Sequence, residues 1–260
     1  MELSLFPLNA VLAPGVAMPL HIFEPRYRAM IGRCIDERRP FGVVLIRRGS
    51  EVGRPAATLA EAGALAEVGT IAEIREVRRM SDGRMDIVTM GTERFRLLSA
   101  RAAPEGYLVG DVAILDEPPG SADALVTLAS RVRGRFVRYL ELLADDVGIG
   151  GDVAGPDAPG DVGADAGEAL DDALARATGG ASVKIGSIRV FLPGDPTRLA
   201  HLIAGLVEVD LPTRQELLEA TTTEARLAAL DVILRDEVAM LRLRLGPYAP
   251  DPRLGAVRRN

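Results

Sequence analysis

The stretch LSLFPLNAVLAPGVAMPLHIFEPRYRAMI, residues 3–31, decides the fold of this chain. Its first residues are leucines bracketing Phe6-Pro7, a pattern that predicts a short strand stopped by Asn9. Pro7 has no amide hydrogen to donate, so the strand should lie at the edge of a sheet or end at this residue.

The rest of the stretch predicts a turn, an extended arm and a helix. Pro14-Gly15 is a turn dipeptide, and Pro19 favours extended geometry in the residue before it. Pro25 suits the first position of a helix, and apolar residues recur at helical spacing from Tyr27 as far as Arg38. We call residues 3–28 the clasp.

Further strands are predicted downstream of this helix. Residues 41–46 are a short apolar run typical of a buried strand, and Asp82-Gly83 is a strong hairpin signal between two longer strands. In the first of these, Ile71, Ile74 and Val77 are expected to face the core. The expected strands cover residues 41–46, 68–80, 85–98 and 107–115.

These stretches, taken in order, closely resemble the substrate-binding domain at the N-terminus of Lon proteases. The resemblance is carried by LFPLNAVLAPGVAMPLHIFEPRYRAMI at 5–31, FGVVLI at 41–46, VGTIA at 68–72, DGR at 82–84 and GTERFR at 91–96. It covers about the first 115 residues and is far more specific than one short motif. It implies a domain that binds polypeptides.

The expected fold class is α+β with two domains. Residues 1–117 should form a small, mostly antiparallel, barrel-like (PUA-like) β domain of about five strands with one helix. Pro118-Pro119-Gly120 marks the boundary, because two prolines and a glycine end a strand and cannot nucleate a helix. Residues 118–260 should then form a helical bundle.

The second domain is predicted to open with a long amphipathic helix. Its apolar face comprises Leu125, Leu128, Val132, Phe136, Tyr139, Leu140 and Leu143. Its remaining surface carries Arg131, Arg133, Arg135 and Arg138. We interpret the arginines as a solvated face that pairs with nearby carboxylates, in preference to an anion site.

An acidic segment follows at residues 145–181. It holds nine acidic residues and one arginine, so the rest of the chain carries about two net positive charges although the whole chain carries −6. The segment is rich in Gly, Ala and Asp and has too few bulky apolar residues to offset its ordering entropy. It is expected to be a disordered insertion.

The last part of the chain should be helical. Asp195-Pro196 predicts the start of a helix that ends at Leu211-Pro212. Thr213 with Glu216, and Thr221 with Glu224, have capping-box spacing and predict two more helix starts. The last helix is predicted to bury Leu227, Leu230, Leu234, Val238, Leu241 and Leu245, and to stop at Gly246-Pro247. LPTRQELLEATTTEARLAALDVIL, at 211–234, resembles the helical tail of the same family.

Composition favours a cytoplasmic protein with a sizeable core. The chain has 260 residues, 48% of them hydrophobic, and no stretch long enough to span a bilayer. Its single cysteine, Cys34, rules out an internal disulfide and is expected to be an inert core thiol.

No catalytic machinery is predicted. The phosphate-loop pattern GxxxxGK[ST] and the GxSxG elbow are both absent, and Lys184 is the sole lysine. His21 and His201 belong to no metal or nucleophile spacing and are interpreted as structural. The sequence therefore predicts a protein without enzyme activity, cofactor or metal.

One polar cluster could belong to a binding site. Glu24, Arg26, Tyr27 and Arg28 stand at the junction of arm and helix. They could hold a peptide, with Arg26 and Tyr27 as the candidate residues. The alternative, which we favour, is that they tie the helix start to the sheet.

The leading functional hypothesis is a non-catalytic module that binds unfolded or exposed hydrophobic polypeptide segments, through sheet edges and apolar side chains between the barrel and the helices. It could act as an adaptor in protein quality control, with a protease or chaperone as partner. RNA binding through a PUA-like barrel is one alternative, disfavoured by a pI of about 5.2 and few aromatics. A structural scaffold is the other.

Overall fold

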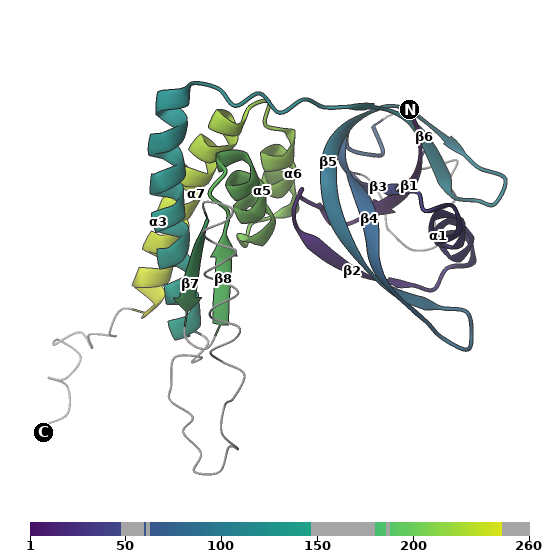
Figure 1. Cartoon of the computed structure of the whole chain (residues 1–260), viewed down its shortest axis with the longest axis horizontal. Coiled ribbons are helices and arrows are strands. Elements are labelled where there is room, and N and C mark those ends of the chain that lie inside the picture. Colours follow the sequence, from purple (N-terminus) through teal and green to yellow (C-terminus); the bar gives the residue numbers. More distant parts are fainter. Residues whose placement is uncertain (48–59, 61–62, 147–179, 186–187, 246–260) are drawn as a thin grey trace, which may run out of the picture.

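The protein has two halves that lie side by side (Figure 1). One is a β-sheet with one helix, and the other is a group of helices with a small hairpin. The structure is a computed structural model that describes residues 1–47, 60, 63–146, 180–185 and 188–245. The acidic segment predicted to be disordered lies almost wholly outside these residues. The predicted α+β class is the one observed.

The larger sheet has six strands, one more than expected. They are β1 (Glu2–Leu8), β2 (Ala17–Ile22), β3 (Phe41–Leu45), β4 (Val68–Arg79), β5 (Met85–Ala102) and β6 (Leu108–Ile114). The order is β2-β5-β4-β3-β1-β6, and β6 also pairs with β5. All pairings are antiparallel except the parallel one between β1 and β3. The additional strand is β2, the expected extended arm.

Pro7 is accommodated because β1 has a partner on only one side there. The pairing of β1 with β6 ends at Leu5, whereas the pairing with β3 continues from Leu5 to Leu8. The strand is internal to the sheet, but its last residues form a local edge at which a missing amide hydrogen costs little.

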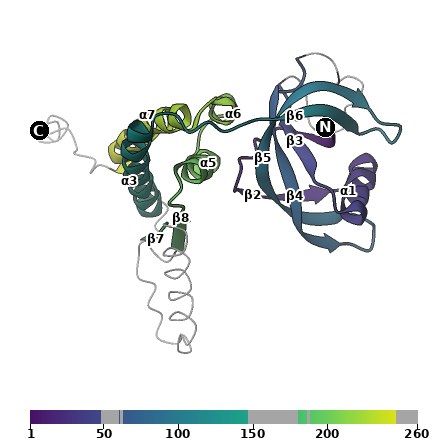
Figure 2. The same cartoon turned by 45° about the horizontal axis from the view of Figure 1, so that its top comes forward.

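The clasp packs helix α1 (Pro25–Glu37) on the sheet, on the side away from the other helices (Figure 2). Tyr27, Met30, Ile31 and Cys34 form its buried face. The ring of Tyr27 stacks on Phe6 of β1 with the centroids 4.2 Å apart. Arg38 ends the helix in the left-handed conformation, with φ of 52°.

The hairpin predicted at Asp82-Gly83 is present between β4 and β5. Gly83 takes a φ of 82°, which favours glycine. The expectation that Val77 faces the core was wrong: Ile71 is buried, but Val77 is 39% exposed. Ile71 and Val77 are six positions apart and would share a face of a regular strand, but the pairing of β4 with β5 has a register irregularity between Ile74 and Glu76, which changes the face that the later side chains take.

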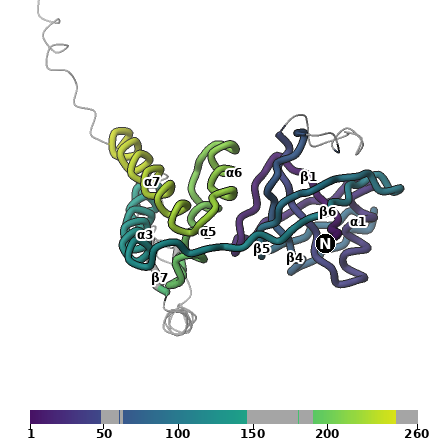
Figure 3. The backbone as a smooth tube through the Cα atoms, turned by 90° about the horizontal axis from the view of Figure 1, so that it is seen from above, coloured from purple at the N-terminus to yellow at the C-terminus, as the bar shows by residue number. Residues whose placement is uncertain are grey.

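The remaining elements are α3 (Ala122–Asp146), α5 (Pro196–Leu206), α6 (Leu211–Glu219), α7 (Thr223–Leu245) and a hairpin of β7 (Ala181–Ile185) and β8 (Ile188–Leu192), which the sequence pattern did not predict. The predicted apolar residues of α3 and α7 are buried or partly buried in one cluster. Figure 3 shows α5 and α6 between the sheet and the α3–α7 pair.

Two helix starts differ from the prediction. Leu211-Pro212 opens α6 instead of ending α5, because the Asp210 side chain accepts the Thr213 amide. For α7 the capping oxygen is that of Thr222, which accepts the Ala225 amide. In both cases an oxygen-bearing residue a few positions away satisfies the same requirement for a cap. The Asp195 cap of α5 was predicted correctly.

The arginines of α3 join elements and do not form a merely solvated face. Arg131 and Arg135 reach Asp231 of α7 at 3.2 and 3.0 Å. Arg133 donates to the carbonyl oxygens of Leu192 and Pro193 at 3.3 and 2.6 Å. Carboxylates close in sequence account only for Arg138, which pairs with Glu141.

The segment Pro118-Pro119-Gly120 connects the sheet to α3 and is bound to the start of α7. The amides of Thr223 and Glu224 donate to the carbonyl oxygens of Pro118 and Pro119, each at 3.0 Å. Glu224 also accepts the Ser121 amide at 2.8 Å. The first turns of α3 and α7 are thereby held together next to the sheet. We call the region where the helices contact the sheet the seam.

Candidate functional site

The candidate binding residues Arg26 and Tyr27 contact each other at the start of α1. The guanidinium carbon of Arg26 lies 4.5 Å from the centre of the Tyr27 ring, and Arg26 pairs with Glu24 at 2.9 Å. Tyr27 is 3% exposed. These contacts are of the kind expected from a structural tie, and a binding role for Arg26 and Tyr27 stays a prediction.

His21 and Cys34 also lie in this half of the molecule. His21 Nδ1 is 2.7 Å from Asp86 Oδ1 on the surface, and hydrogen bonds from His21 and Arg78 lower the pKa of Asp86. Cys34 is buried, and burial raises its pKa to about 11. A thiol with this pKa is protonated near neutral pH and is a poor nucleophile.

A cavity lies in the seam. It has a volume of about 790 Å³ and is bounded by the Pro14-Gly15 turn, residues 90–94 of β5, residues 114–117 and α5. We call it the seam cavity. Its apolar lining residues are Met90, Ile114, Leu115, Leu202 and two prolines. This volume falls in the range of ordinary ligand-binding pockets.

The seam cavity opens where β5 changes partner. One edge of β5 pairs with β2 as far as Met90 and with β6 from Phe95 onward. Between them Gly91 exchanges hydrogen bonds with the turn before β2, through the Gly15 amide at 2.8 Å and the Val16 carbonyl at 3.0 Å. A side chain at Gly91 would collide with the Ala13 carbonyl. This glycine therefore permits the close approach that forms one wall.

Glu117 is the centre of the polar wall. Its carboxylate pairs with Arg94 of β5 and with Arg226 of α7, and its Oε2 lies 3.3 Å from His201 Nε2 of α5. Thr223 donates to Oε1 at 3.3 Å. One carboxylate thus connects the sheet to two helices.

Burial by itself would raise the pKa of Glu117, but the hydrogen bonds from His201 and Arg226 and the charge of Arg226 outweigh it and lower the pKa to about 2. The carboxylate therefore stays ionised at neutral pH. Burial lowers the pKa of His201, and together with the charges of Arg226 and Arg94 it outweighs the hydrogen bond and charge of Glu117, which raise the pKa. The imidazole is therefore neutral at neutral pH.

The two arginines also bind the carbonyl groups at the end of α6. Arg94 Nη1 donates to Leu218 and Ala220 at 2.8 and 2.7 Å. Arg226 donates to Leu217 and Ala220 at 2.8 and 3.0 Å. The last carbonyls of a helix have no partner within it, so these side chains replace water in the seam. Arg94 and Arg226 are 4% and 0% exposed.

This arrangement is suited to holding elements together and lining a pocket. The oxygens of Glu117 are taken up by Arg94, Arg226, His201 and Thr223, so it is poorly placed to act as a general base. Within the described ranges, no group of three or more His, Cys, Asp or Glu residues could hold a metal ion. No helix in the same ranges is long and apolar enough to cross a membrane.

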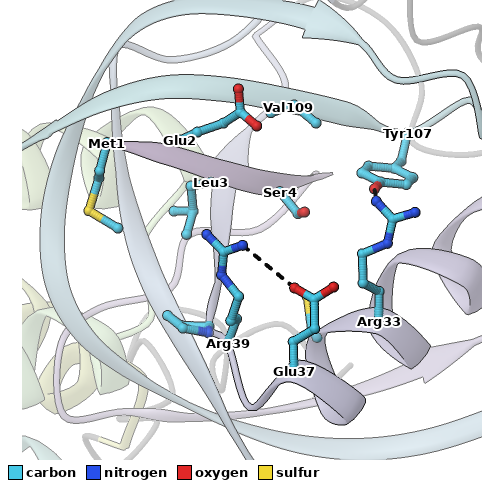
Figure 4. A pocket seen from close by; sticks show the side chains of 11 residues that line it. Met1, Glu2, Leu3, Ser4, Arg33, Glu37, Arg39, Tyr107 and Val109 are labelled. Carbon is cyan, nitrogen blue, oxygen red and sulfur yellow. Dashed lines mark hydrogen bonds and ion pairs between the residues drawn. The ribbon is translucent and has the colours of Figure 1, made fainter.

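A second cavity lies between β1, β6 and α1 (Figure 4). Its volume is about 190 Å³, below the usual range for ligands. Arg33 is occupied by Tyr107 Oη at 2.9 Å and by Glu105 at 2.6 Å, and Arg39 pairs with Glu37 at 3.5 Å. Because these cations are already paired, we assign no ligand to this cavity.

Sequence reasoning did not find the seam residues. Arg94 belongs to the GTERFR motif and Arg226 to the helical tail, while Glu117 directly precedes the predicted domain boundary. Their one shared signal is a charged residue within or next to an otherwise apolar pattern. Such a signal does not identify the partner of Glu117, whether that is Arg94 on a nearby strand or Arg226, which is 109 residues away.

Comparisons with known proteins agree with this fold. A solved structure described as a Lon N-terminal domain protein from Xanthomonas campestris matches with a TM-score of 0.50 and 22% identity, over 88% of this chain and 96% of that one. The N-terminal domain of Mycobacterium avium complex Lon protease matches with a TM-score of 0.52 and 17% identity, over 92% and 98%.

Two curated relatives match in sequence. Lon protease 2 of Herpetosiphon aurantiacus is 26% identical over 94% of this chain, which corresponds to 25% of that protein. Protein cereblon of Xenopus tropicalis is 27% identical over 42% of this chain and 23% of its own length. The chain thus spans about a quarter of the length of these relatives.

The family model for the substrate-binding domain of ATP-dependent protease La (LON) matches residues 2–236, which takes in the clasp, the whole six-stranded sheet and most of α7. With the fold and this match together, the chain belongs to the LON substrate-binding domain family.

Proposed function

We propose that this protein is a non-catalytic module that binds unfolded or exposed hydrophobic polypeptide segments, and that the seam cavity is the binding site. One observation carries the proposal: a member of a substrate-binding family has a cavity of about 790 Å³ in its seam, where Met90, Ile114, Leu115 and Leu202 line it among polar and charged residues. Such a pocket can receive one or a few apolar side chains.

The exposed side chains of the cavity support this choice. Ile114 is 41% exposed although it sits at the end of β6 against the seam. The charged lining residues are balanced, three arginines against three carboxylates, with Arg94 and Glu117 already paired with each other. A balanced rim favours uncharged ligand segments over a strongly acidic or basic one. The same balance gives no support to RNA as the ligand.

Binding by addition of a strand is less well supported than insertion of side chains. In the described sheet, β2 is the terminal strand, and every other strand has two partners along at least part of its length. Pro19 lies in the middle of β2 and cannot donate a hydrogen bond to an added strand. We therefore place the affinity in apolar contacts within the seam cavity and not in the sheet edges.

We also propose a role for each domain and a kind of partner. Residues 1–117 would act as a barrel-like, PUA-like domain and residues 118–260 as a helical bundle, so that the site is formed between two domains. The module would deliver bound polypeptide to a protease or chaperone, as an adaptor, without processing it.

A pair of substitutions tests the site. Ile114→Asp places a charge in the seam cavity, whereas Leu98→Asp places one on β5 at a side chain that is 59% exposed and does not line the cavity. The probe is a reduced and carboxymethylated, permanently unfolded protein, with binding followed by fluorescence anisotropy. We expect Ile114→Asp to weaken binding at least about tenfold, since burying a charge in an apolar contact costs more than about 1.4 kcal/mol.

The control should bind as the wild type does. Equal loss in both variants would show that the cavity is not the site, and an absence of saturable binding by the wild type would refute the polypeptide-binding function. Circular dichroism of both variants checks that each remains folded.

A further inference from the structure

His201 is a buried histidine with only one of its two ring nitrogens in use. Nε2 faces the Glu117 carboxylate at 3.3 Å, so in the neutral ring this nitrogen carries the hydrogen. Nδ1 is buried and has no hydrogen-bond partner among the residues that the structure describes. The residue is 5% exposed. The site is therefore built for the neutral imidazole.

A second proton on His201 has no place in this arrangement. It would add an N–H at Nδ1, where the described part of the chain offers no acceptor, and a buried donor left unpaired is costly. The Glu117 carboxylate at Nε2 favours the imidazolium, but Arg94 of β5 and Arg226 of α7 already share that one carboxylate and repel a third cation. A hydrated imidazolium, in contrast, finds both acceptors and screening in water.

Displacement of α5 from the sheet would relieve this conflict, and it would alter the seam cavity. The lining residues of α5 include His201, its neighbour Leu202 and Arg198 one turn earlier. The opposite side of α5 is anchored among the helices by Leu199, Ala200 and Ile203, all 0% exposed. The contact that can give way is thus the one between α5 and the sheet.

We propose that protonation of His201 separates α5 from Glu117 and opens the seam, so that polypeptide held in the seam cavity is released as the pH falls. Release rests on the proposed function, whereas opening does not. Because an imidazole in water titrates near about pH 6.5, the open form gains population below that pH, by up to about tenfold for each pH unit.

The effect of protonating His201 can be tested separately from that of other histidines. His21 and His201 are the only two histidines, and His21 is exposed on β2 and paired with Asp86. His201→Gln keeps an N–H donor for Glu117 but cannot titrate. His21→Gln is the matched control, and both variants are first checked for wild-type circular dichroism at about pH 7.5, where the neutral imidazole prevails.

Opening is measured by hydrogen exchange of the α5 amides between about pH 7.5 and 5.5, comparing proteins at the same pH so that intrinsic rates cancel. We expect wild type and His21→Gln to exchange about tenfold faster than His201→Gln at the lower pH, and all three to agree at the higher one. Equal exchange at the lower pH overturns the proposal. If His201→Gln fails to fold, NMR titration of the two imidazoles in the wild type replaces it: the His201 titration must coincide with the change in α5 exchange.

Release is measured in parallel with the unfolded probe protein. Affinity of the wild type should fall across the same pH range, and that of His201→Gln should not. Opening without a change in affinity would refute the release step alone. No binding at any pH, with opening intact, would refute the polypeptide-binding function and leave the His201 switch standing.

Discussion

Arg94 Nη1 lies 2.8 Å from the carbonyl oxygen of Leu218, so the guanidinium of a central strand forms part of the end of a helix in the other half of the molecule. The Gln215 amide nitrogen makes a similar link to the Val68 carbonyl at 2.9 Å, and Leu218 itself packs into an apolar cluster of the sheet. Residues of α6 are therefore part of the core on both sides of the seam.

Substitution of Arg94 should be strongly destabilising. Arg94→Met keeps most of the side-chain volume but leaves the Leu218 carbonyl unsatisfied, takes one of two donors from the Ala220 carbonyl and removes one cation from half-buried Glu117. We expect a loss of about 3 kcal/mol in the free energy of unfolding, measured by urea titration with far-ultraviolet circular dichroism.

Arg101→Met is the control on the same strand. Arg101 is exposed and pairs with exposed Glu2 at 2.6 Å, so its loss should cost less than about 1 kcal/mol. Similar losses for the two arginines would contradict the importance assigned to the seam.

Stability should fall in acid as Glu117 becomes protonated. Its pKa is about 2 in the folded protein against an ordinary value of 4.5, so the folded state binds its proton more weakly than the unfolded state. The stabilisation is complete above pH 4.5 and is lost as the pH falls toward about 2. Its size is on the order of 3 kcal/mol.

The comparison of wild type with Glu117→Gln isolates this contribution, since other carboxylates titrate in both proteins. With His201→Gln present in both proteins, so that the neighbouring imidazole does not titrate, the difference in unfolding free energy between them should be constant from about pH 7 to 5 and shrink between about pH 4.5 and 2. A difference that did not change with pH would mean that the pKa of Glu117 is not lowered.

Gly91 should tolerate no side chain. Gly91→Ala forces a methyl group against the Ala13 carbonyl and pushes the Pro14-Gly15 turn away from β5. We expect a cost of about 1–3 kcal/mol, together with weaker binding of the unfolded probe because the turn is a wall of the seam cavity.

Gly134→Ala serves as the opposite case. Gly134 lies within α3, and among the described residues no side chain or distant backbone atom comes within 4 Å of the place that a methyl group would occupy. Alanine should therefore stabilise the protein by about 0.5–1 kcal/mol. Thermal melts of the two variants are expected to shift in opposite directions. A Gly91→Ala protein as stable as the wild type would show that the close approach of turn and strand is not required.

The sequence by itself determined the local structure and the family. Hydrophobic periodicity placed most strands and the long helices, Pro25 and Asp195 indicated two helix starts, and Asp82-Gly83 indicated the hairpin, because each depends on residues a few positions apart. The order of motifs at both ends of the chain identified the family before any contact was known.

Only the tertiary structure decided where the candidate site lies. Glu117, Arg94, His201 and Arg226 come from four separate segments, and nothing in their local patterns says that they meet. From the sequence alone, charged residues are expected at the surface, because burying an ion without a partner costs too much free energy. These residues can be buried because their charges offset one another. The pairing depends on how the helices pack against the sheet, which only the folded chain specifies.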